Sequence, residues 1–562
     1  MNNLNRTNKI KPNKKLWEFH GGVHPPFHKS DSNQLPIGEV TIPDTLILPL
    51  QQHSGRAAQP IVKVGDNIFK GQLIAQMTKN GLSANLHAPT SGTIDAIEKR
   101  PIPHSSGLSA LCIILNTDGK DDWGEHKLEL IKDFTKVQAS ALLERIQLAG
   151  IVGLGGAAFP SAVKLAKKEL SSQHHIDTLI INGAECEPYI TCDDRLMREK
   201  NAEIMVGIQI IQQLIKPKKC LIGIEDNKAE AIKAMQHACQ KTKDSSIEVI
   251  SIPTIYPSGG EKQLIEILTG KEVPANGLPR DIGILGLNVG TLFSIYNAVV
   301  NGIPLISRIV TITGNGVQAP QNFEVLIGTS FHHLAALAGG LTKMADHLIM
   351  GGPMMGYALE DDQTPVVKAT NCALFISTTS LNETNSAFSN QATLPCIRCG
   401  KCMHACPVNL LPQQLYWHIR AKDFEKTIDH NLYDCIECGC CSYVCPSHIP
   451  LVDYYRFAKA EIKDQQEAKE KADVARERHE FLIFRKERDK RERDEKRAAH
   501  KAALQKKKAA TKVKNAENAD STNKSTVTDV KAEAIKAALE RSKAKKEARQ
   551  LAMEKDKKED KK

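Results

Sequence analysis

The chain has 562 residues, with 75 Lys and Arg, 65 Asp and Glu, 15 Cys and only 5% aromatic residues. This length is too great for one hydrophobic core, so we expect about two to four domains. The excess positive charge lies at the end of the chain, where 461–562 holds 32 basic and 22 acidic residues. The first 460 residues hold 43 of each sign, which excludes a basic body of the kind that binds nucleic acid.

Two segments bear on the expected compartment. Residues 1–15 are rich in Asn and Lys and lack the apolar centre of a secretion signal. The uncharged stretch 282–307 is long enough to cross a bilayer, but it contains three Asn, one Pro and four Gly. We therefore expect it to form a buried strand, turn and helix of a soluble domain. Without a secretion signal the cysteines face a reducing environment, which favours metal or cluster ligation over disulfides.

The first two segments precede the main body of the chain. Residues 1–40 are rich in Pro, Gly and His and predict an extended arm. Residues 41–135 contain short alternating runs separated by Gly turns, which indicate a small all-β domain.

In 136–304, helical patterns alternate with apolar strands, which is typical of an α/β domain. Residues 305–385 begin with a β pattern and continue with a short apolar helix, which predicts an α+β module. Residues 386–460 are dense in Cys. Over half of 461–562 is charged, so we expect an exposed helical or disordered tail.

Eight cysteines form two copies of the pattern C-x2-C-x2-C-x3-C-P, placed 39 residues apart. This is the spacing of two-cluster ferredoxins, in which three close thiolates bind one [4Fe–4S] cluster and the fourth binds the other. Structural zinc is the alternative, but zinc favours C-x2-C pairs with longer spacers. Cys440 breaks the spacing and is expected to be a bystander. The predicted ligands are Cys396, Cys399, Cys402 and Cys445 for cluster one, and Cys435, Cys438, Cys441 and Cys406 for cluster two.

A glycine-rich loop, 151–160, precedes a predicted helix that begins near Ser161. Such a loop lets backbone N–H groups approach a phosphate, and a lysine in the first helical turn can reach the same anion. A Rossmann loop is a second interpretation, but the preceding pattern is helical and the first acid at a strand end follows Gly153 by 32 residues. A tight turn without a ligand is the third. The candidate residues are Gly153, Gly155, Gly156 and Lys164.

Two polar segments follow apolar strands further along the chain. The segment 182–188, with Asn182 and Glu185, comes directly after the predicted strand 179–181. Open α/β sheets bind ligands beyond the carboxyl ends of their strands. The segment 256–264 repeats this design with a glycine turn, an acid and a helix, although a solvated helix cap would look the same.

In this order, together with 287–292, these motifs resemble the FMN- and NADH-binding subunit of respiratory complex I and its relatives. With the arm at 19–25 and the doubled cysteine motif, 15–460 resembles more closely the RnfC/RsxC subunits of the Rnf/Rsx ion-translocating electron transport complexes. The resemblance implies a β-grasp-like (SLBB-like) ligand-binding module at 305–385. It also implies FMN held by Gly153, Gly155, Gly156, Lys164, Asn182, Glu185 and Asn288, with Tyr256 and Glu261 near the nucleotide.

The chain departs from the flavoprotein pattern at three positions. Ala184 replaces an Asp, Lys262 replaces the second Glu of a Gly-Glu-Glu turn, and Leu287 replaces an Asn. These changes remove polar contacts and reverse one charge. They leave the iron–sulfur prediction unaffected.

The all-β segment resembles the lipoyl or biotinyl barrel-sandwich fold through 64–72 and 87–94. The intervening hairpin tip has Lys79 but no Met-Lys-Met, so we expect a docking or scaffold domain rather than a swinging arm. The basic tail is either a solvated extension or an electrostatic contact with an anionic membrane surface.

The expected protein is therefore a multidomain α/β chain with small all-β and α+β modules. We expect a peripheral electron-input subunit at the cytoplasmic face of the inner membrane, which links NADH, FMN and two [4Fe–4S] clusters to an ion-translocating complex. The expected partners are NADH, other subunits and a ferredoxin-like acceptor, with no nucleic acid. The alternatives are a soluble NADH dehydrogenase (diaphorase) subunit and a non-catalytic iron–sulfur adapter with a degenerate flavin site. No catalytic side chain is expected, because hydride transfer belongs to the cofactors.

Overall fold

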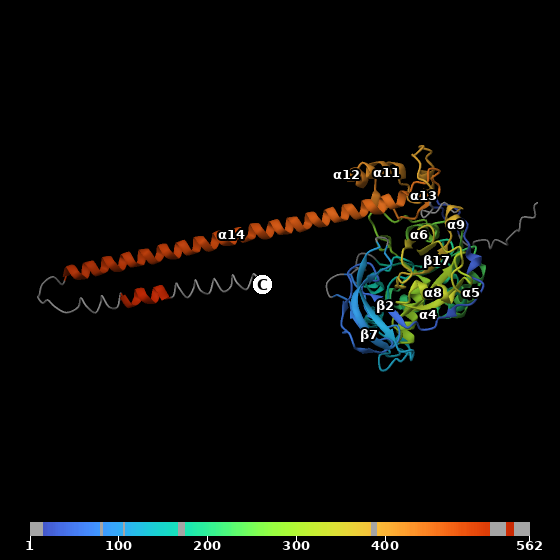
Figure 1. The fold of residues 1–562 in the computed structure, drawn as a ribbon, viewed down its shortest axis with the longest axis horizontal. Coiled ribbons are helices and arrows are strands. Elements are labelled where there is room, and N and C mark those ends of the chain that lie inside the picture. Colours follow the sequence, from blue (N-terminus) through green and yellow to red (C-terminus); the bar gives the residue numbers. More distant parts are fainter. Residues whose placement is uncertain are drawn as a thin grey trace, which may run out of the picture. The chain divides into compact units, whose positions relative to one another are not determined.

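The computed structural model describes residues 15–78, 82–104, 107–166, 175–383, 391–517 and 536–544. The chain divides into two compact units, 1–464 and 465–562. The first unit contains every sheet among the described residues and all the predicted site residues (Figure 1). Within these ranges four short 3-10 helices accompany the regular elements: η1 (Lys29–Asp31), η2 (Phe134–Lys136), η3 (Pro279–Ile282) and η4 (Leu432–Asp434).

The small all-β domain is confirmed as two antiparallel sheets. Leu46, Ile74 and Ile94 come from different strands and are buried in one shared core, because alternate side chains of each strand point to the same face. Lys79 of the predicted hairpin tip lies outside the described residues. One sheet has the order β2 (Thr45–Pro49), β8 (Ser109–Thr117), β7 (Gly92–Pro101), β4 (Asn67–Ile68), and the other β3 (Gln59–Pro60), β5 (Leu73–Gln76), β6 (Leu86–His87).

The α/β domain is built on a parallel four-stranded sheet. The chain runs outward from the first strand to the third and then returns to the other side of the first, so the sheet has a topological switch point between β9 and β12. Open α/β sheets bind ligands at such a point, beyond the carboxyl ends of the strands. The sheet order is β11 (Ile247–Ile252), β10 (Lys219–Glu225), β9 (Thr178–Asn182), β12 (Ile284–Asn288).

Seven helices in the described part of this domain surround its sheet in sequence, and the last of them comes from the uncharged stretch. That stretch forms the buried strand β12 and the helix α7, as expected. Among the described residues, no helix has both the length and the apolarity needed to cross a membrane. The helices are α1 (Ala139–Leu148), α2 (Ser161–Leu165), α3 (Cys192–Glu199), α4 (Asn201–Ile215), α5 (Ala229–Thr242), α6 (Glu261–Thr269) and α7 (Val289–Val300).

The α+β module is a six-stranded mixed sheet accompanied by two helices, α8 (Phe331–Leu337) and α9 (Thr378–Glu383). Its edge strand β1 belongs to the arm, because Gly38 and Glu39 pair in parallel with β14. The end of the arm is therefore part of this sheet. The order is β1 (Gly38–Glu39), β14 (Gln321–Leu326), β13 (Ser307–Thr313), β17 (Cys372–Ile376), β15 (His347–Met350), β16 (Tyr357–Leu359).

The Cys-dense segment folds as short helices around its own apolar core, which includes Leu415, Leu432 and Tyr455. Small core volume is typical of domains that obtain further stability from metal ligation. Its helices are α10 (Lys401–Ala405), α11 (Pro412–Arg420), α12 (Phe424–Asp429), α13 (Cys440–Tyr443) and the start of α14 (Leu451–Glu517).

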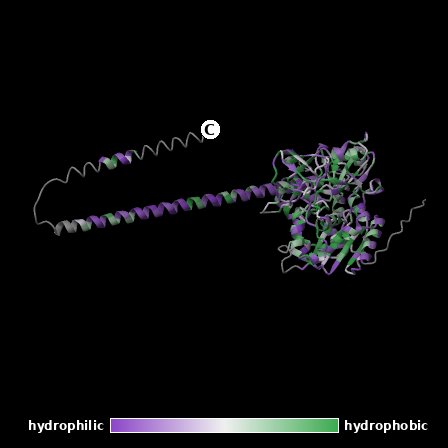
Figure 2. Cartoon of the chain, turned by 90° about the horizontal axis from the view of Figure 1, so that it is seen from below, coloured by the Kyte–Doolittle hydropathy of each residue, from purple (hydrophilic) through white to green (hydrophobic). Residues whose placement is uncertain are grey.

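The second unit consists, where it is described, of the rest of α14 and the helical residues 536–544. Its side chains are almost all exposed, and Figure 2 shows its helix as mostly hydrophilic with a short apolar stretch. This confirms the exposed helix that the charged composition of the tail predicts.

Candidate functional site

Two asparagines lie opposite each other at the switch point of the parallel sheet. Asn182 ends β9, Asn288 ends β12, and the two residues are register partners. The Asn288 amide caps α7 by accepting from the Gly290 N–H at 2.9 Å, and it donates to Asp193 Oδ2 at 2.6 Å. The Asn182 amide donates to the Gly259 carbonyl at 2.8 Å. Each predicted asparagine therefore holds a neighbouring loop at the expected ligand-binding edge.

The glycine loop lies against this edge and is closed on itself. The Gly153 N–H donates to the Phe159 carbonyl at 2.8 Å. A Cβ atom at Gly155 would come within 3.2 Å of the Asn288 side chain, while Gly156 has a φ of +111° with open space around it. Such exposed glycines leave backbone N–H groups accessible to a close ligand. The loop thus fits the phosphate group of a flavin nucleotide.

Lys164 and Glu261 are brought together from α2 and the first turn of α6. Their side chains form an ion pair at 2.7 Å, and both are partly exposed. A pair of this kind adds little to stability because solvent screens it. An anionic ligand at the glycine loop would therefore compete with Glu261 for the Lys164 ammonium group.

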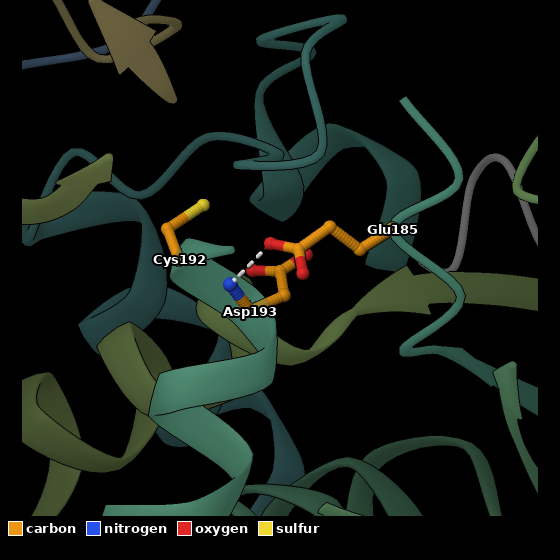
Figure 3. A group of neighbouring side chains, drawn as sticks. All are labelled: Glu185, Cys192 and Asp193. Carbon is orange, nitrogen blue, oxygen red and sulfur yellow. Dashed lines mark hydrogen bonds between the residues drawn. The ribbon is translucent and has the colours of Figure 1, made fainter. Parts of the chain in front are cut away.

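Glu185 lies at the N-terminus of α3, beside Cys192 and Asp193 (Figure 3). Its two carboxylate oxygens accept from the N–H groups of Asp193 and Asp194 at 2.6 and 3.2 Å. Burial, assisted by the neighbouring Asp193 carboxylate, raises the pKa of Glu185 to about 8. The Glu185, Cys192 and Asp193 ligand atoms lie within 4.8 Å of one another, but the helix N-terminus and Asn288 already engage both carboxyl groups.

A lysine of the arm fixes the loop that carries Glu185. The Lys29 ammonium group donates to three backbone carbonyls, those of Glu185, Glu187 and Ile190, at 2.6–2.7 Å. Sequence reasoning missed Lys29 because a single lysine in an irregular arm carries no motif.

A buried ion pair supports the same region from the end of β10. Lys228 and Glu225 are 2.8 Å apart and almost fully buried, and the Ser258 hydroxyl donates to Glu225 at 2.7 Å. A buried pair tolerates desolvation only when further hydrogen bonds complete it, as Ser258 does here. Neither charged residue belongs to a motif, and the sequence analysis did not identify them.

Tyr256 lies away from the glycine loop, although the resemblance places it near the nucleotide. Its side chain is completely buried, and its hydroxyl donates to the Cys438 carbonyl at 2.7 Å. Its backbone pairs with Val23 of the arm at 2.8 and 2.9 Å. Tyr256 therefore connects the α/β domain to the second cysteine motif.

The thiols predicted to bind cluster two surround a common cavity. Its empty volume is about 330 Å³, and the lining between the thiols is apolar, with Leu415, Val452 and Tyr455 among it. Burial raises the pKa of Cys435 to about 12, so a positive metal centre is needed to hold its thiolate form. Four thiols around an apolar space fit a [4Fe–4S] cluster. The four are Cys406, Cys435, Cys438 and Cys441.

The remaining four predicted ligands form the second group. Burial, followed by the neighbouring Cys445 and Cys399, raises the pKa of Cys402. Cys396, Cys402 and Cys445 also pack against the same apolar core. Cys440 is fully buried beside Cys438 rather than among the cavity-lining thiols. The assignment of individual ligands to each cluster stays a prediction.

Four family models match consecutive parts of the chain. They are the RnfC barrel sandwich hybrid domain at 17–120, the Nuo51 FMN-binding domain at 146–297, the SLBB domain at 309–358 and the 4Fe-4S dicluster domain at 395–449. These matches agree with the fold class expected from the sequence. They also agree with the position of the glycine loop and of the cysteine motifs.

Known relatives are similar over most of the chain. The RnfC-type subunit of the ion-translocating oxidoreductase complex of Pseudomonas aeruginosa is 49% identical over 86% of this chain and 60% of its own length. The same subunit of Yersinia enterocolitica is 47% identical over 86% of this chain and 68% of its own length. The solved structure of a NAD+-reducing [NiFe]-hydrogenase in the H2-reduced state covers 58% of this chain and 63% of that chain, at 18% identity and a TM-score of 0.43.

The match to the Pseudomonas relative spans about 60% of that protein's length. The match to the Yersinia relative exceeds two thirds of that protein, at an identity far above chance. The cysteine quartets and the glycine loop both lie inside the matched domain models. The chain belongs to the family of RnfC subunits of the ion-translocating oxidoreductase complexes.

Proposed function

We propose that this chain is the electron-input subunit of a membrane-bound oxidoreductase complex. It would take reducing equivalents from NADH at an FMN held by the α/β domain and deliver single electrons to two [4Fe–4S] clusters. FMN supplies the conversion of a two-electron donor into one-electron steps, and the clusters supply the outward relay. The subunit would bind its membrane partners peripherally, at the cytoplasmic face.

One contact carries the proposal. The loop of Tyr256 and Gly259, which Asn182 holds at the switch point, contacts the backbone of the cluster-two ligand Cys438. The buried Cys186 thiol, from the loop that carries Glu185, accepts from the Gly259 N–H at 3.3 Å and packs in the same apolar cluster as Cys438. The predicted flavin edge and the cluster-two cavity are therefore linked by two adjoining, directly packed loops.

The chain's own residues have separate roles in this proposal. Gly155 and Gly156 would present backbone N–H groups to the flavin phosphate, and Lys164 would supply the countercharge. Glu185 and Asn288 would hold the ends of α3 and α7 in place, and the Glu185 carboxyl, with its raised pKa, can keep a proton near neutral pH. The eight cysteines would bind the clusters and exclude water from cluster two.

A second candidate function is a cluster-only adapter. Lys164 is paired with Glu261, and Asn182 and Asn288 are hydrogen-bonded within the protein. These contacts satisfy the flavin-site side chains without a ligand. Ala184, which replaces an acid, is fully buried and adds no polar group.

Anaerobic reconstitution tests the two candidates. The full chain is loaded with iron and sulfide, incubated with FMN, desalted and assayed for iron, sulfide and flavin before NADH is added. The proposed function predicts about eight iron and about one FMN per chain, with loss of cluster absorbance on adding NADH. Eight iron without FMN, and no spectral response to NADH, would refute it in favour of the adapter. A Gly155→Asp control should lose FMN while keeping its iron.

A further inference from the structure

The ferredoxin-type domain contains two copies of one motif, and its backbone repeats as the sequence does. The sequence 396–407 corresponds to 435–446, with each residue matched 39 positions later. Arg398 and Glu437 both have positive φ, 55° and 57°, and Gly400 and Gly439 have φ values of 77° and 81°. The surroundings of the two copies can therefore be compared residue by residue.

The face of the second copy is covered by the rest of the first unit. A Cβ atom at Gly439 would lie 2.7 Å from the Met354 carbonyl oxygen of the SLBB domain. Cys440 is completely buried, and the Cys438 carbonyl accepts from Tyr256. Two other domains thus pack directly on the polypeptide that surrounds cluster two.

The corresponding face of the first copy is open. A Cβ atom at Gly400 would meet nothing within 4 Å, and the Ile397 side chain is 68% exposed, whereas its counterpart Ile436 is partly buried. Of the eight predicted ligands, all within the described residues, Cys399 is the exposed one. The neighbouring Leu394 side chain is 55% exposed on a backbone that Ser447 holds at 2.9 Å.

The open face also carries one sign of charge. Residues 391–422 contain four Lys or Arg and no Asp or Glu. Arg398 and Lys401 are exposed, and Lys401 stands where the second copy has the buried Cys440. A partner that covers this face as the other domains cover the second copy must therefore place acidic groups opposite Lys401.

We propose that this face docks an acidic one-electron carrier protein, which approaches cluster one as the α/β domain approaches cluster two. We call it the cluster-one face; it consists of Leu394, Ile397, Arg398, Cys399, Lys401 and His404. The inference rests on the proposed function, because it assumes that both cysteine groups hold clusters. In the complex one electron passes between iron centres, one centre being oxidised and the other reduced, and no bond or proton moves. A small apolar centre with a charged rim suits such transient redox complexes.

Binding without electron flow tests the proposal directly. The reconstituted, oxidised full chain is titrated into an isotope-labelled, oxidised plant-type [2Fe–2S] ferredoxin, which is acidic, and Kd is followed by NMR at low and moderate salt. The variant Arg398→Glu with Lys401→Glu should raise Kd at least tenfold at low salt and flatten its salt dependence. The control Lys233→Glu, which makes a charge change on the exposed face of α5, should stay within twofold of the unchanged chain.

An unchanged Kd in the double variant, or an equal rise in the α5 control, would overturn the proposal. Should the double variant lose iron, Ile397→Ser keeps all charges and should still weaken binding severalfold; unaltered binding there is equally refuting. Self-association of the chain through this face, seen by sedimentation and abolished by the double variant, would also overturn it. Reduction by dithionite instead of NADH then measures electron delivery to the ferredoxin, so that failure at the flavin is separated from failure of docking.

Discussion

Removing one hydroxyl group should loosen the contact between the α/β domain and the cluster-two loop. Tyr256 is fully buried, and its hydroxyl donates to the Cys438 carbonyl at 2.7 Å. In Tyr256→Phe that bond is lost, and burial keeps solvent from replacing it. A buried bond of this kind contributes about 1.5 kcal/mol, allowing for the unsatisfied acceptor. This corresponds to about a tenfold change in the local opening equilibrium.

The chain supplies a matched control for this change. Tyr455 is 1% exposed and its hydroxyl donates to the Pro412 carbonyl at 2.8 Å, but both residues belong to the ferredoxin-type domain. Tyr455→Phe should cost a similar free energy of unfolding without acting across the domain contact. The two variants therefore separate loss of a hydrogen bond from loss of a bond between domains.

Hydrogen exchange measured by mass spectrometry on the reconstituted protein provides the assay. The peptide covering 436–445 should exchange about tenfold faster in Tyr256→Phe. In Tyr455→Phe the faster exchange should instead appear at the start of α11 and α14. Equal exchange of 436–445 in both variants, or no change in Tyr256→Phe, would show that the hydroxyl does not hold the two domains together.

Three further predictions follow from the cysteines and from two buried ionisable groups. Cys435→Ser should lower bound iron from about eight to about four per chain, whereas Cys440→Ser should leave it unchanged, as measured by iron assay. Glu185 has its pKa raised to about 8, so the folded chain holds a proton there that the unfolded chain releases near pH 4.5. Stability should therefore fall as pH rises from about 5 to 8, and Glu185→Gln should flatten that slope in thermal unfolding. The pKa of Lys368 is lowered to about 7 by burial, where its ammonium group donates to the Asn85 and Gly150 carbonyls at 2.7 Å. Between pH 7 and about 10 the unfolded chain binds more protons at Lys368, so stability should rise with pH there; Lys368→Met should remove this rise, and a persisting slope would assign it to another group.

Local patterns predicted the elements well because each depends on residues close together in the chain. The alternation at 308–314 indicated β13, and the run of apolar residues before Gly339 indicated α8. The pairing of β1 with β14 was not predictable, because two residues of an irregular arm join a strand nearly 300 positions away. Tertiary context decides such pairings, and intrinsic strand preference does not.

The candidate site divides in the same way. The cysteine ligands were identified because a cluster requires thiolates at fixed short spacings. Asn182 and Asn288 were identified because strand ends mark ligand edges in parallel sheets. Lys29 and Arg308 were not, since each acts through distant backbone: Lys29 on the loop of Glu185, and Arg308 on the Leu154 carbonyl of the glycine loop at 3.3 Å. No short sequence pattern encodes a contact that only the folded chain creates.

The arm explains how separate domains can form one electron path. Its Gly22 N–H donates to the Ala405 carbonyl at 3.1 Å, and the His20 ring nitrogen bonds the Cys406 carbonyl at 2.8 Å. A Cβ atom at Gly21 would lie 2.7 Å from the Ala405 backbone, and its φ of +71° also favours glycine. Further along, Lys29 fixes the loop of Glu185. The same short segment thus contacts the cluster-two ligand loop and the flavin-site loop, so displacement of the arm would disturb both ends of the proposed transfer together.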